Sequence, residues 1–202
     1  EPVTVVLSQK GWIRAAKGRV EDPSELKFKE GDKLFAVVEC RSPDPVVLLG
    51  SDGRAYTVIA SQVPGGKGDG VPAASVIGLQ PGTKIVSALA GQAEDRLLLS
   101  NSGGNGFVAT IADMLSRQKG GKLLMALEDG ELVLPPARIP PVGQESGEHY
   151  VACVSSSDKL LVFALGEVKQ MPKGRGVILM SLDKNDSLKL AGVFSDTLIL
   201  KG

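Results

Sequence analysis

The chain has 202 residues, and its 23 lysines and arginines balance its 23 aspartates and glutamates. Zero net charge argues against a protein coated uniformly in positive charge, but it says nothing about where the charges lie. The 43% of apolar residues can build a sizeable core, which argues against wholesale disorder. The 25 glycines and 12 prolines indicate many turns between short strands.

Two observations bear on the compartment. No apolar run approaches the roughly 18–20 residues that span a bilayer, and the opening Glu1-Pro2-Val3 shows no basic segment followed by an apolar stretch. We therefore expect no membrane segment, no signal peptide and a cytoplasmic location. Cys40 and Cys153 lie in apolar runs without CxxC spacing, so we expect buried free thiols, with a disulfide as the alternative.

Short runs rich in Val, Leu and Ile recur along the chain, separated by Gly, Pro, Asn, Asp and Ser, and this pattern predicts strands. The predicted strands cover residues 3–7, 33–40, 45–50, 54–59, 96–100, 106–111, 122–127, 150–155, 159–165 and 197–201. Only residues 111–118 could form a helical turn or two, and Gly120-Gly121 would end it. An all-β fold is therefore expected.

The chain also resembles itself. Segments 3–18, 45–68, 96–122 and 150–176 each contain an apolar strand, a small polar turn, a second strand and a loop with glycine and lysine, and 192–202 starts the plan again. We place the repeats at about 1–44, 45–95, 96–149, 150–191 and a partial 192–202, within one domain, 1–202. The loop lysines Lys17, Lys67, Lys122 and Lys173 are spaced 50, 55 and 51 residues apart.

A period near fifty with about four strands per unit predicts four-stranded blades arranged radially, as in a propeller, with a fifth unit that starts at residue 192. A sandwich or barrel with similar hairpins is the alternative. WD40 and kelch propellers fit poorly, because no repeat ends in Trp-Asp and Trp12 is the sole tryptophan.

The residues suggest no catalytic or metal site. His149 has no nearby cysteine or histidine for zinc and no serine nucleophile, so we expect a surface or strand-edge side chain. The glycine-rich stretch 65–70 lacks the hydroxyl residue that a phosphate-binding P-loop carries after its lysine. Acid pairs such as those in 128–131 lie in polar, turn-like segments, where carboxylates are usually solvated.

The zero net charge conceals a segregation. Basic residues gather in acid-free or nearly acid-free loops, whereas acids gather in the connections between repeats. The basic stretches are 10–19, 117–122 and 169–175, and the acidic ones are 21–32, 94–95, 128–131 and 145–148. If the repeats are blades, equivalent loops lie at equivalent positions around the rim, and the basic clusters form one curved track.

Such a track suits the phosphate backbone of DNA, because Lys and Arg displace condensed counterions and glycines let the main chain approach. Scarce aromatic residues disfavour single strands, and the lack of a helix for the major groove disfavours base reading. We expect sequence-independent binding of duplex DNA, bent at a cost of a few kcal/mol. The candidate DNA-binding residues are Lys10, Arg14, Lys17, Arg19, Arg54, Lys67, Arg117, Lys119, Lys122, Lys173 and Arg175.

These residues resemble a known family. The opening segment 3–18 is similar to the first repeat of the C-terminal domain found in the A subunits of bacterial type IIA topoisomerases, and the similarity extends through all four units, most closely to the topoisomerase IV branch. The residues in register in this first repeat are Ser8, Gly11, Trp12, Arg14, Lys17 and Gly18.

A second motif carries the same resemblance. Residues 62–68 occupy the place of a box whose gyrase form reads Gln-Arg/Lys-Arg-Gly-Gly-Lys-Gly. Gln62, Gly65, Gly66, Lys67 and Gly68 match this box. Val63 and Pro64 replace both variable basic positions, and a degenerate box of this kind is typical of topoisomerase IV, which binds and bends DNA without gyrase-like wrapping.

The resemblance implies a β-pinwheel of five four-stranded blades, open or spiral rather than closed, with strands exchanged between neighbouring blades. It also implies a domain without catalysis, which helps decatenation and supercoil relaxation. ATP, Mg²⁺ and the cleavage tyrosine would lie elsewhere in the holoenzyme, so no cofactor is expected in this domain. Expected partners are duplex DNA, the catalytic core of the same subunit, and the ATPase subunit, in a nucleoid-associated complex. The alternatives are the DNA-wrapping domain of gyrase and, from another class, a protein-interaction propeller.

Overall fold

A computed structural model describes residues 1–65, 68–141, 148–195, 198 and 200–201. The sequence suggests one domain, whereas the structure groups the chain into two compact units. Unit 1 comprises residues 1–92 and 114–123, and unit 2 comprises residues 93–113 and 124–202. The loop 114–123 of the third repeat thus belongs with the first two repeats.

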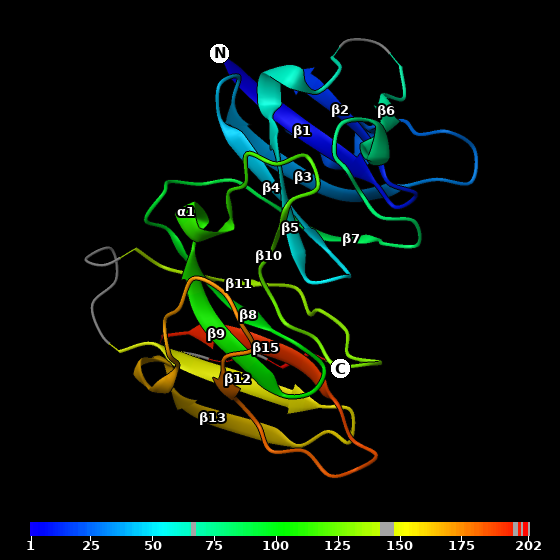
Figure 1. The fold of residues 1–202 in the computed structure, drawn as a ribbon. Helices are drawn as coiled ribbons and strands as arrows, with labels where there is room; N and C mark the ends of the chain where they lie inside the picture. Colours follow the sequence, from blue (N-terminus) through cyan, green and yellow to red (C-terminus); the bar gives the residue numbers. More distant parts are fainter. Residues whose placement is uncertain (66–67, 142–147, 196–197, 199, 202) are drawn as a thin grey trace. The chain divides into compact units, whose positions relative to one another are not determined.

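Unit 1 contains two four-stranded antiparallel sheets (Figure 1). The first has the order β3 (Leu34–Arg41), β1 (Pro2–Ser8), β2 (Trp12–Lys17) and β6 (Val71–Pro72). The second has the order β10 (Lys122–Leu123), β5 (Arg54–Ile59), β4 (Pro45–Gly50) and β7 (Ile85–Leu89). Buried apolar side chains of both sheets form one core, which includes Leu7, Ile13, Leu48 and Tyr56.

Unit 2 contains a four-stranded and a three-stranded sheet. The third sheet has the order β11 (Ala137–Ile139), β8 (Arg96–Ser100), β9 (Asn105–Thr110) and β14 (Val177–Ile178). The fourth has the order β13 (Leu160–Ala164), β12 (Tyr150–Ser155) and β15 (Leu188–Phe194). Their shared core includes Leu98, Val108, Val151 and Cys153.

Three sheets receive their last strand from the following repeat. β6 of the second repeat pairs with β2, β10 of the third pairs with β5, and β14 of the fourth pairs with β9. The all-β prediction and the strand exchange implied by the family resemblance are therefore confirmed. We call β6, β10 and β14 the exchanged strands.

The chain's last described strand differs from the expectation of a fifth unit. Residues 192–194 belong to β15, where Gly192 pairs with Ala152 of β12. β15 is thus the third strand of the fourth sheet, as β3 is of the first, and the described residues form four sheets rather than five.

The hairpin turn of each repeat contains one residue with positive φ, and the N–H of this residue donates to the carbonyl of the residue three positions earlier. Gly11, Gly53 and Gly104 have φ of 85°, 81° and 88°. The fourth repeat places Asp158 there, with φ 63°, and its N–H donates to the carbonyl of Ser155 at 3.1 Å. Aspartate tolerates the left-handed region better than most residues, so the turn survives the missing glycine.

Short helical turns follow the second strand in three repeats. The predicted helical segment within 111–118 is α1 (Ile111–Met114), and its counterparts are the 3₁₀ turns η2 (Ala60–Gln62) and η4 (Leu165–Glu167). Two further 3₁₀ turns are η1 (Pro23–Glu25) and η3 (Ala73–Ser75). No helix in the described part of the chain is long and apolar enough to cross a membrane.

Two predicted strands are shorter than expected or lie partly outside the described residues. In 122–127, Lys122 and Leu123 pair with β5 in unit 1, whereas Leu124 and Met125 are buried in unit 2 without joining a strand. In 197–201, the described residues 198, 200 and 201 form no strand, and 197 and 199 lie outside the described residues.

Candidate nucleic-acid interface

The basic residues are best understood from the loops that precede the exchanged strands. We name these the exchange loops: residues 63–70, 115–121 and 168–176. Each follows a helical turn and ends at a glycine with positive φ, namely Gly70 at 84°, Gly121 at 70° and Gly176 at 84°. A Cβ on these glycines would lie 2.1, 2.5 and 2.0 Å from the carbonyl oxygens of Ile13, Ala55 and Gly106 respectively. Only glycine lets the loop pass this close to the preceding blade.

Main-chain bonds hold the exchange loops along the second strand of the blade they join. Ala15 donates its N–H to the carbonyl of Pro64 at 2.8 Å, and Val108 donates to the carbonyl of Lys169 at 3.0 Å. In the middle loop, the N–H of Ser116 donates to Oγ1 of Thr57 at 2.9 Å. These bonds fix the backbone, so the basic side chains project from a defined scaffold.

Four of the predicted DNA-binding residues in unit 1 are available to a ligand. Lys17, Arg117 and Lys119 are exposed and Lys122 is half-buried, and none forms a side-chain hydrogen bond or ion pair with another described residue. Exposed lysines and arginines without internal partners can neutralise phosphates without first breaking a protein contact. We name these four residues the free basic set.

Two further predicted residues hold the scaffold instead. The guanidinium of Arg14 donates to the carbonyls of Gly68 at 2.8 Å and Lys27 at 2.7 Å, and it lies 5.0 Å from the centre of the Phe28 ring. Arg54 donates to the carbonyls of Gly120 at 3.0 Å and Gly121 at 3.2 Å. Arg14 and Arg54 therefore position the exchange loops.

Two predicted arginines are engaged by acids. Arg19 forms an exposed ion pair with Glu39 at 2.9 Å. Arg175 binds Glu131 with both terminal nitrogens, and Glu128 lies 3.8 Å away. The hydrogen bond from Arg175 lowers the pKa of Glu131, whose side chain is only 10% exposed, so this acid is not the solvated carboxylate that its turn-like sequence suggests.

Three predicted DNA-binding residues remain: Lys10, Lys173 and Lys67. Lys10 is exposed, and its backbone N–H donates to Oδ1 of Asp32 at 3.0 Å. Lys173 is exposed in the third exchange loop, in unit 2. Lys67 and Gly66 lie outside the described residues.

Two of the four loop lysines, Lys17 and Lys122, do not occupy equivalent positions. Lys17 ends β2, whereas Lys122 begins an exchanged strand and pairs with Ala55. The residues that match Lys122 in this register are Val71, paired with Ile13, and Val177, paired with Gly106. The near-regular period of the lysines therefore does not mean that one lysine site recurs in all four repeats.

The charges divide sharply between the two units. Unit 1 carries 14 lysines and arginines against 10 acids, a formal charge of +4, whereas unit 2 carries 9 against 13, a formal charge of −4. Eight of the described candidate basic residues belong to unit 1, and only Lys173 and Arg175 belong to unit 2. The exchange loop 115–121 contributes to this surplus because it joins unit 1.

The degenerate box has a structural explanation at one of its two altered positions. Val63 is 5% exposed and belongs to the core of unit 1. Val63 is the fourth residue counted from the start of η2. The fourth residues counted from the starts of α1 and η4, Met114 and Val168, are also buried, so this place favours an apolar side chain. Pro64, by contrast, is exposed, as are Gln62, Gly65 and Gly68, so its side chain could be replaced by a basic one.

One contact of a basic residue was not predicted from the sequence. Lys29, in the acidic connection 21–32, places its ammonium 3.5 Å from the centre of the Trp12 ring. The cation–π contact holds the connection against β2 and covers one face of the lone tryptophan. The only signal in the sequence was a lysine within an acidic stretch, and nothing in the sequence shows that this stretch folds back onto Trp12.

No group of three or more His, Cys, Asp or Glu that could hold a metal ion occurs within the described ranges. His149 is half-buried and directly precedes β12. Cys40 and Cys153 are free thiols, as expected, but only Cys153 is buried, whereas Cys40 is half-buried. Burial raises the pKa of Cys153 to about 11.

The chain is similar to the A subunits of bacterial type IIA topoisomerases. A family model described as "DNA gyrase C-terminal domain, beta-propeller" matches residues 149–194. The A subunit of DNA topoisomerase 4 from Neisseria gonorrhoeae is 40% identical over 203 residues, covering 99% of this chain and 26% of the relative. The same-named protein of Escherichia coli K12 is 32% identical over 189 residues, covering 94% and 24%. The chain thus spans about a quarter of the length of these relatives.

Solved structures agree. One described as "Structure of the E. coli ParC C-terminal domain" has a TM-score of 0.88 and 31% sequence identity, covering 96% of this chain and 80% of the other. A second, "Crystal structure of the C-terminal domain of DNA topoisomerase IV", has a TM-score of 0.80 at 17% identity, over 97% and 62% of the two chains. At that identity the second match supports the fold alone.

Proposed function

Because this chain belongs to the family of C-terminal domains of topoisomerase IV A subunits, we propose that it holds duplex DNA for a type IIA topoisomerase without catalysing a reaction itself. The free basic set on unit 1 carries this proposal. It offers four cationic side chains on a unit whose charge is +4, within a chain whose net charge is zero.

The partition of charge removes the main objection to DNA binding. Interactions between exposed charges fall off over about 10 Å at 0.1 M salt, so a phosphate near unit 1 responds to nearby cations more than to the net charge of the chain. Arg175 and Arg19 are left out of the proposed surface, since each would have to exchange an acid partner for a phosphate. Arg14 and Arg54 contribute by holding the loops.

Binding would not depend on DNA sequence. The longest α-helix among the described residues has four residues, too short to present a row of side chains to the major groove. Lys29 covers one face of the Trp12 ring, so that face offers no stacking platform for single-stranded bases. Contacts to the phosphate backbone of a duplex are what this surface offers.

The box favours DNA bending without extensive wrapping. The basic side chains of the gyrase form are absent at Val63, which the core needs, and at the exposed Pro64. We therefore assign the chain to the topoisomerase IV type rather than to the gyrase type. A wrapping domain would drive positive writhe in a relaxed plasmid when ligase is added, and we expect little or none.

In the holoenzyme, the domain would help decatenation and supercoil relaxation by holding one DNA segment. Its partners would be the catalytic core of the same subunit, together with the ATPase subunit, in the bacterial cytoplasm at the nucleoid. ATP and Mg²⁺ would bind elsewhere in the holoenzyme, so no cofactor is assigned to this domain.

Charge reversal tests the proposal. In the test variant, Lys17, Arg117, Lys119 and Lys122 are all replaced by Glu, and affinity for a 30-base-pair duplex is measured by fluorescence anisotropy. Loss of four phosphate contacts should weaken binding by at least about 100-fold in 0.1 M salt. Arg14 is left unchanged because its substitution would also release the loop it holds.

A matched control makes the same change of charge on unit 2. Lys169, Lys184, Lys189 and Lys201 are exposed and are replaced together by Glu. We expect the control to lose less than about fivefold in affinity, because these residues lie on the acidic unit. Equal losses in both variants would contradict a site on unit 1, and no DNA binding by the parent chain would favour a protein-interaction propeller.

A further inference from the structure

The fourth sheet lacks the strand that the other three receive. β2, β5 and β9 each pair with an exchanged strand from the next repeat, whereas no described strand pairs with the outer edge of β13. This edge presents main-chain N–H and C=O groups that could pair with an extended segment.

The side chains of β13 are correspondingly uncovered. Counting from the positive-φ residue of each turn, Leu160 matches Ile13 and Ala55, which are both 0% exposed, yet Leu160 is 47% exposed. Val162 matches Val108, which is 2% exposed, yet Val162 is 42% exposed. Natural edge strands usually carry a lysine, a proline or a bulge against unwanted pairing, and the run 160–164 carries none.

The three existing exchanged strands define what would fit. Each begins after a glycine that lies against the carbonyl of the accepting strand. The residue directly after each exchanged strand is buried: Ala73, Leu124 and Leu179 are 1%, 0% and 3% exposed. The segment therefore has the form Gly-x-x-apolar. An exchange loop also runs along the accepting strand, where the N–H groups of Ala15 and Val108 donate to it. Val162 occupies the same place in β13.

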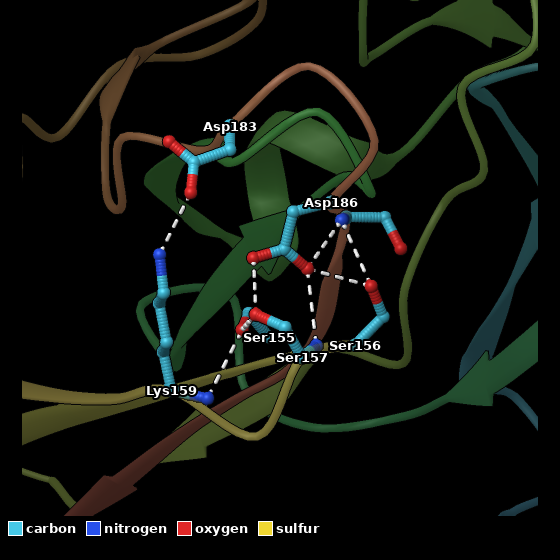
Figure 2. Close-up of polar contacts among 7 residues, drawn as sticks. Ser155, Ser156, Ser157, Lys159, Asp183 and Asp186 are labelled. Carbon is cyan, nitrogen blue, oxygen red and sulfur yellow. Dashed lines mark hydrogen bonds and ion pairs between the residues drawn. The ribbon is translucent and has the colours of Figure 1, made fainter.

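A carboxylate lies where it could bind a basic residue that precedes the glycine of the added segment. In the third sheet, Glu131 lies beneath the turn at Gly103 and binds Arg175, the residue directly before Gly176. In the fourth sheet, Asp186 takes the equivalent place, accepting the N–H and the hydroxyl of Ser157 at 3.1 and 2.7 Å (Figure 2). Hydrogen bonds from Ser156 and Ser157 lower the pKa of Asp186, so it is a carboxylate at neutral pH.

We propose that the outer edge of β13 binds an extended peptide segment of the form basic-Gly-x-x-apolar, as a fourth strand of the fourth sheet. The segment runs antiparallel to β13, its glycine lies against the carbonyl of Leu160, and its basic residue faces Asp186. This site is independent of DNA binding, since it lies on unit 2 and uses none of the free basic set.

A peptide from the chain itself tests the site. The probe is a fluorescent peptide with the sequence of residues 172–182, PKGRGVILMSL, titrated with the 202-residue chain. We expect saturable one-to-one binding, weakened at least about tenfold when the peptide carries Gly176→Val, because a Cβ would meet the accepting carbonyl. The peptide with Arg175→Gln should bind about threefold more weakly.

Changes in the protein identify the edge. Val162→Lys should weaken binding at least about tenfold, and hydrogen exchange should show the N–H of Val162 protected by the peptide. Equal binding of the Gly176→Val peptide, or no saturation, overturns the proposal. Protection of Val108 instead of Val162 would mean that the peptide replaces β14, and this outcome also overturns it. The proposal is also overturned if the chain self-associates, Val162→Lys abolishes this self-association, and the peptide does not.

Discussion

Gly176→Ala tests whether the close approach of an exchange loop to the preceding blade is essential to the fold. Gly176 has φ 84°, and an added Cβ would lie 2.0 Å from the carbonyl oxygen of Gly106. Gly130, also in unit 2, has φ 80° and nothing within 4 Å of the same position. The two glycines therefore share a conformation and differ in their surroundings.

The expected cost follows from this comparison. A left-handed conformation costs alanine about 1–2 kcal/mol, so Gly130→Ala should lower the free energy of unfolding by roughly that amount. Gly176→Ala must also move β14, which forms only two residue pairs with β9. Losing those main-chain bonds adds about 2 kcal/mol, for a total of roughly 3–4 kcal/mol.

Urea unfolding monitored by circular dichroism measures both losses. The difference between the two variants isolates the contact with Gly106, because the conformational penalty is common to both. Hydrogen exchange at Val177 and Ile178 should rise in Gly176→Ala and remain unchanged in Gly130→Ala. Equal destabilisation of the two variants would refute the close packing of the exchange loop.

Three further predictions concern single side chains. Pro64→Arg should raise affinity for duplex DNA about threefold or more in anisotropy titrations and steepen the salt dependence by about 0.9, whereas Pro64→Gln should do neither. Cys153 should resist alkylation until the chain unfolds. Its pKa of about 11 in the folded chain lies above the ordinary 9.0, so between these values the folded state keeps a proton that the unfolded state loses. The free energy of unfolding should therefore fall as pH rises from 9 to 11, and it should fall less in Cys153→Ala. Glu131→Gln should lower the free energy of unfolding at pH 7 by about 1–2 kcal/mol. Because Arg175 lowers the pKa of Glu131, its contribution is present above the ordinary value of 4.5, so the two proteins should converge as pH falls below it; a constant difference would speak against the ion pair.

The central strands of the blades were predictable because the signals are local. β4, β5, β8 and β12 have the bounds expected from their apolar runs, which end at Gly, Ser or a polar turn. The exchanged strands β6 and β14 were not predicted, and β10 was predicted only as the start of a longer strand, because their pairing depends on the register of a different repeat. The end of β15, residues 192–194, was assigned to a fifth unit because it resembles the start of a repeat, and only its pairing with β12 distinguishes the two.

The candidate interface was predictable in composition but not in detail. The basic loops are present, yet the sequence could not separate free side chains from engaged ones. The partners of Arg54 lie 66 and 67 residues away and are main-chain carbonyls, which carry no residue signature. Glu131 reaches Arg175 across 44 residues. The division of charge also depends on loop 115–121 belonging to unit 1.

The salt dependence of DNA binding tests the central claim most directly. The logarithm of the binding constant is plotted against the logarithm of salt concentration for the parent chain and for a variant with Lys17, Arg117, Lys119 and Lys122 replaced by Ala. If these side chains contact phosphates, the slope of the variant should be shallower by about 3 to 4, since each contact contributes roughly 0.9. Parallel lines would contradict a DNA-binding surface formed by the free basic set.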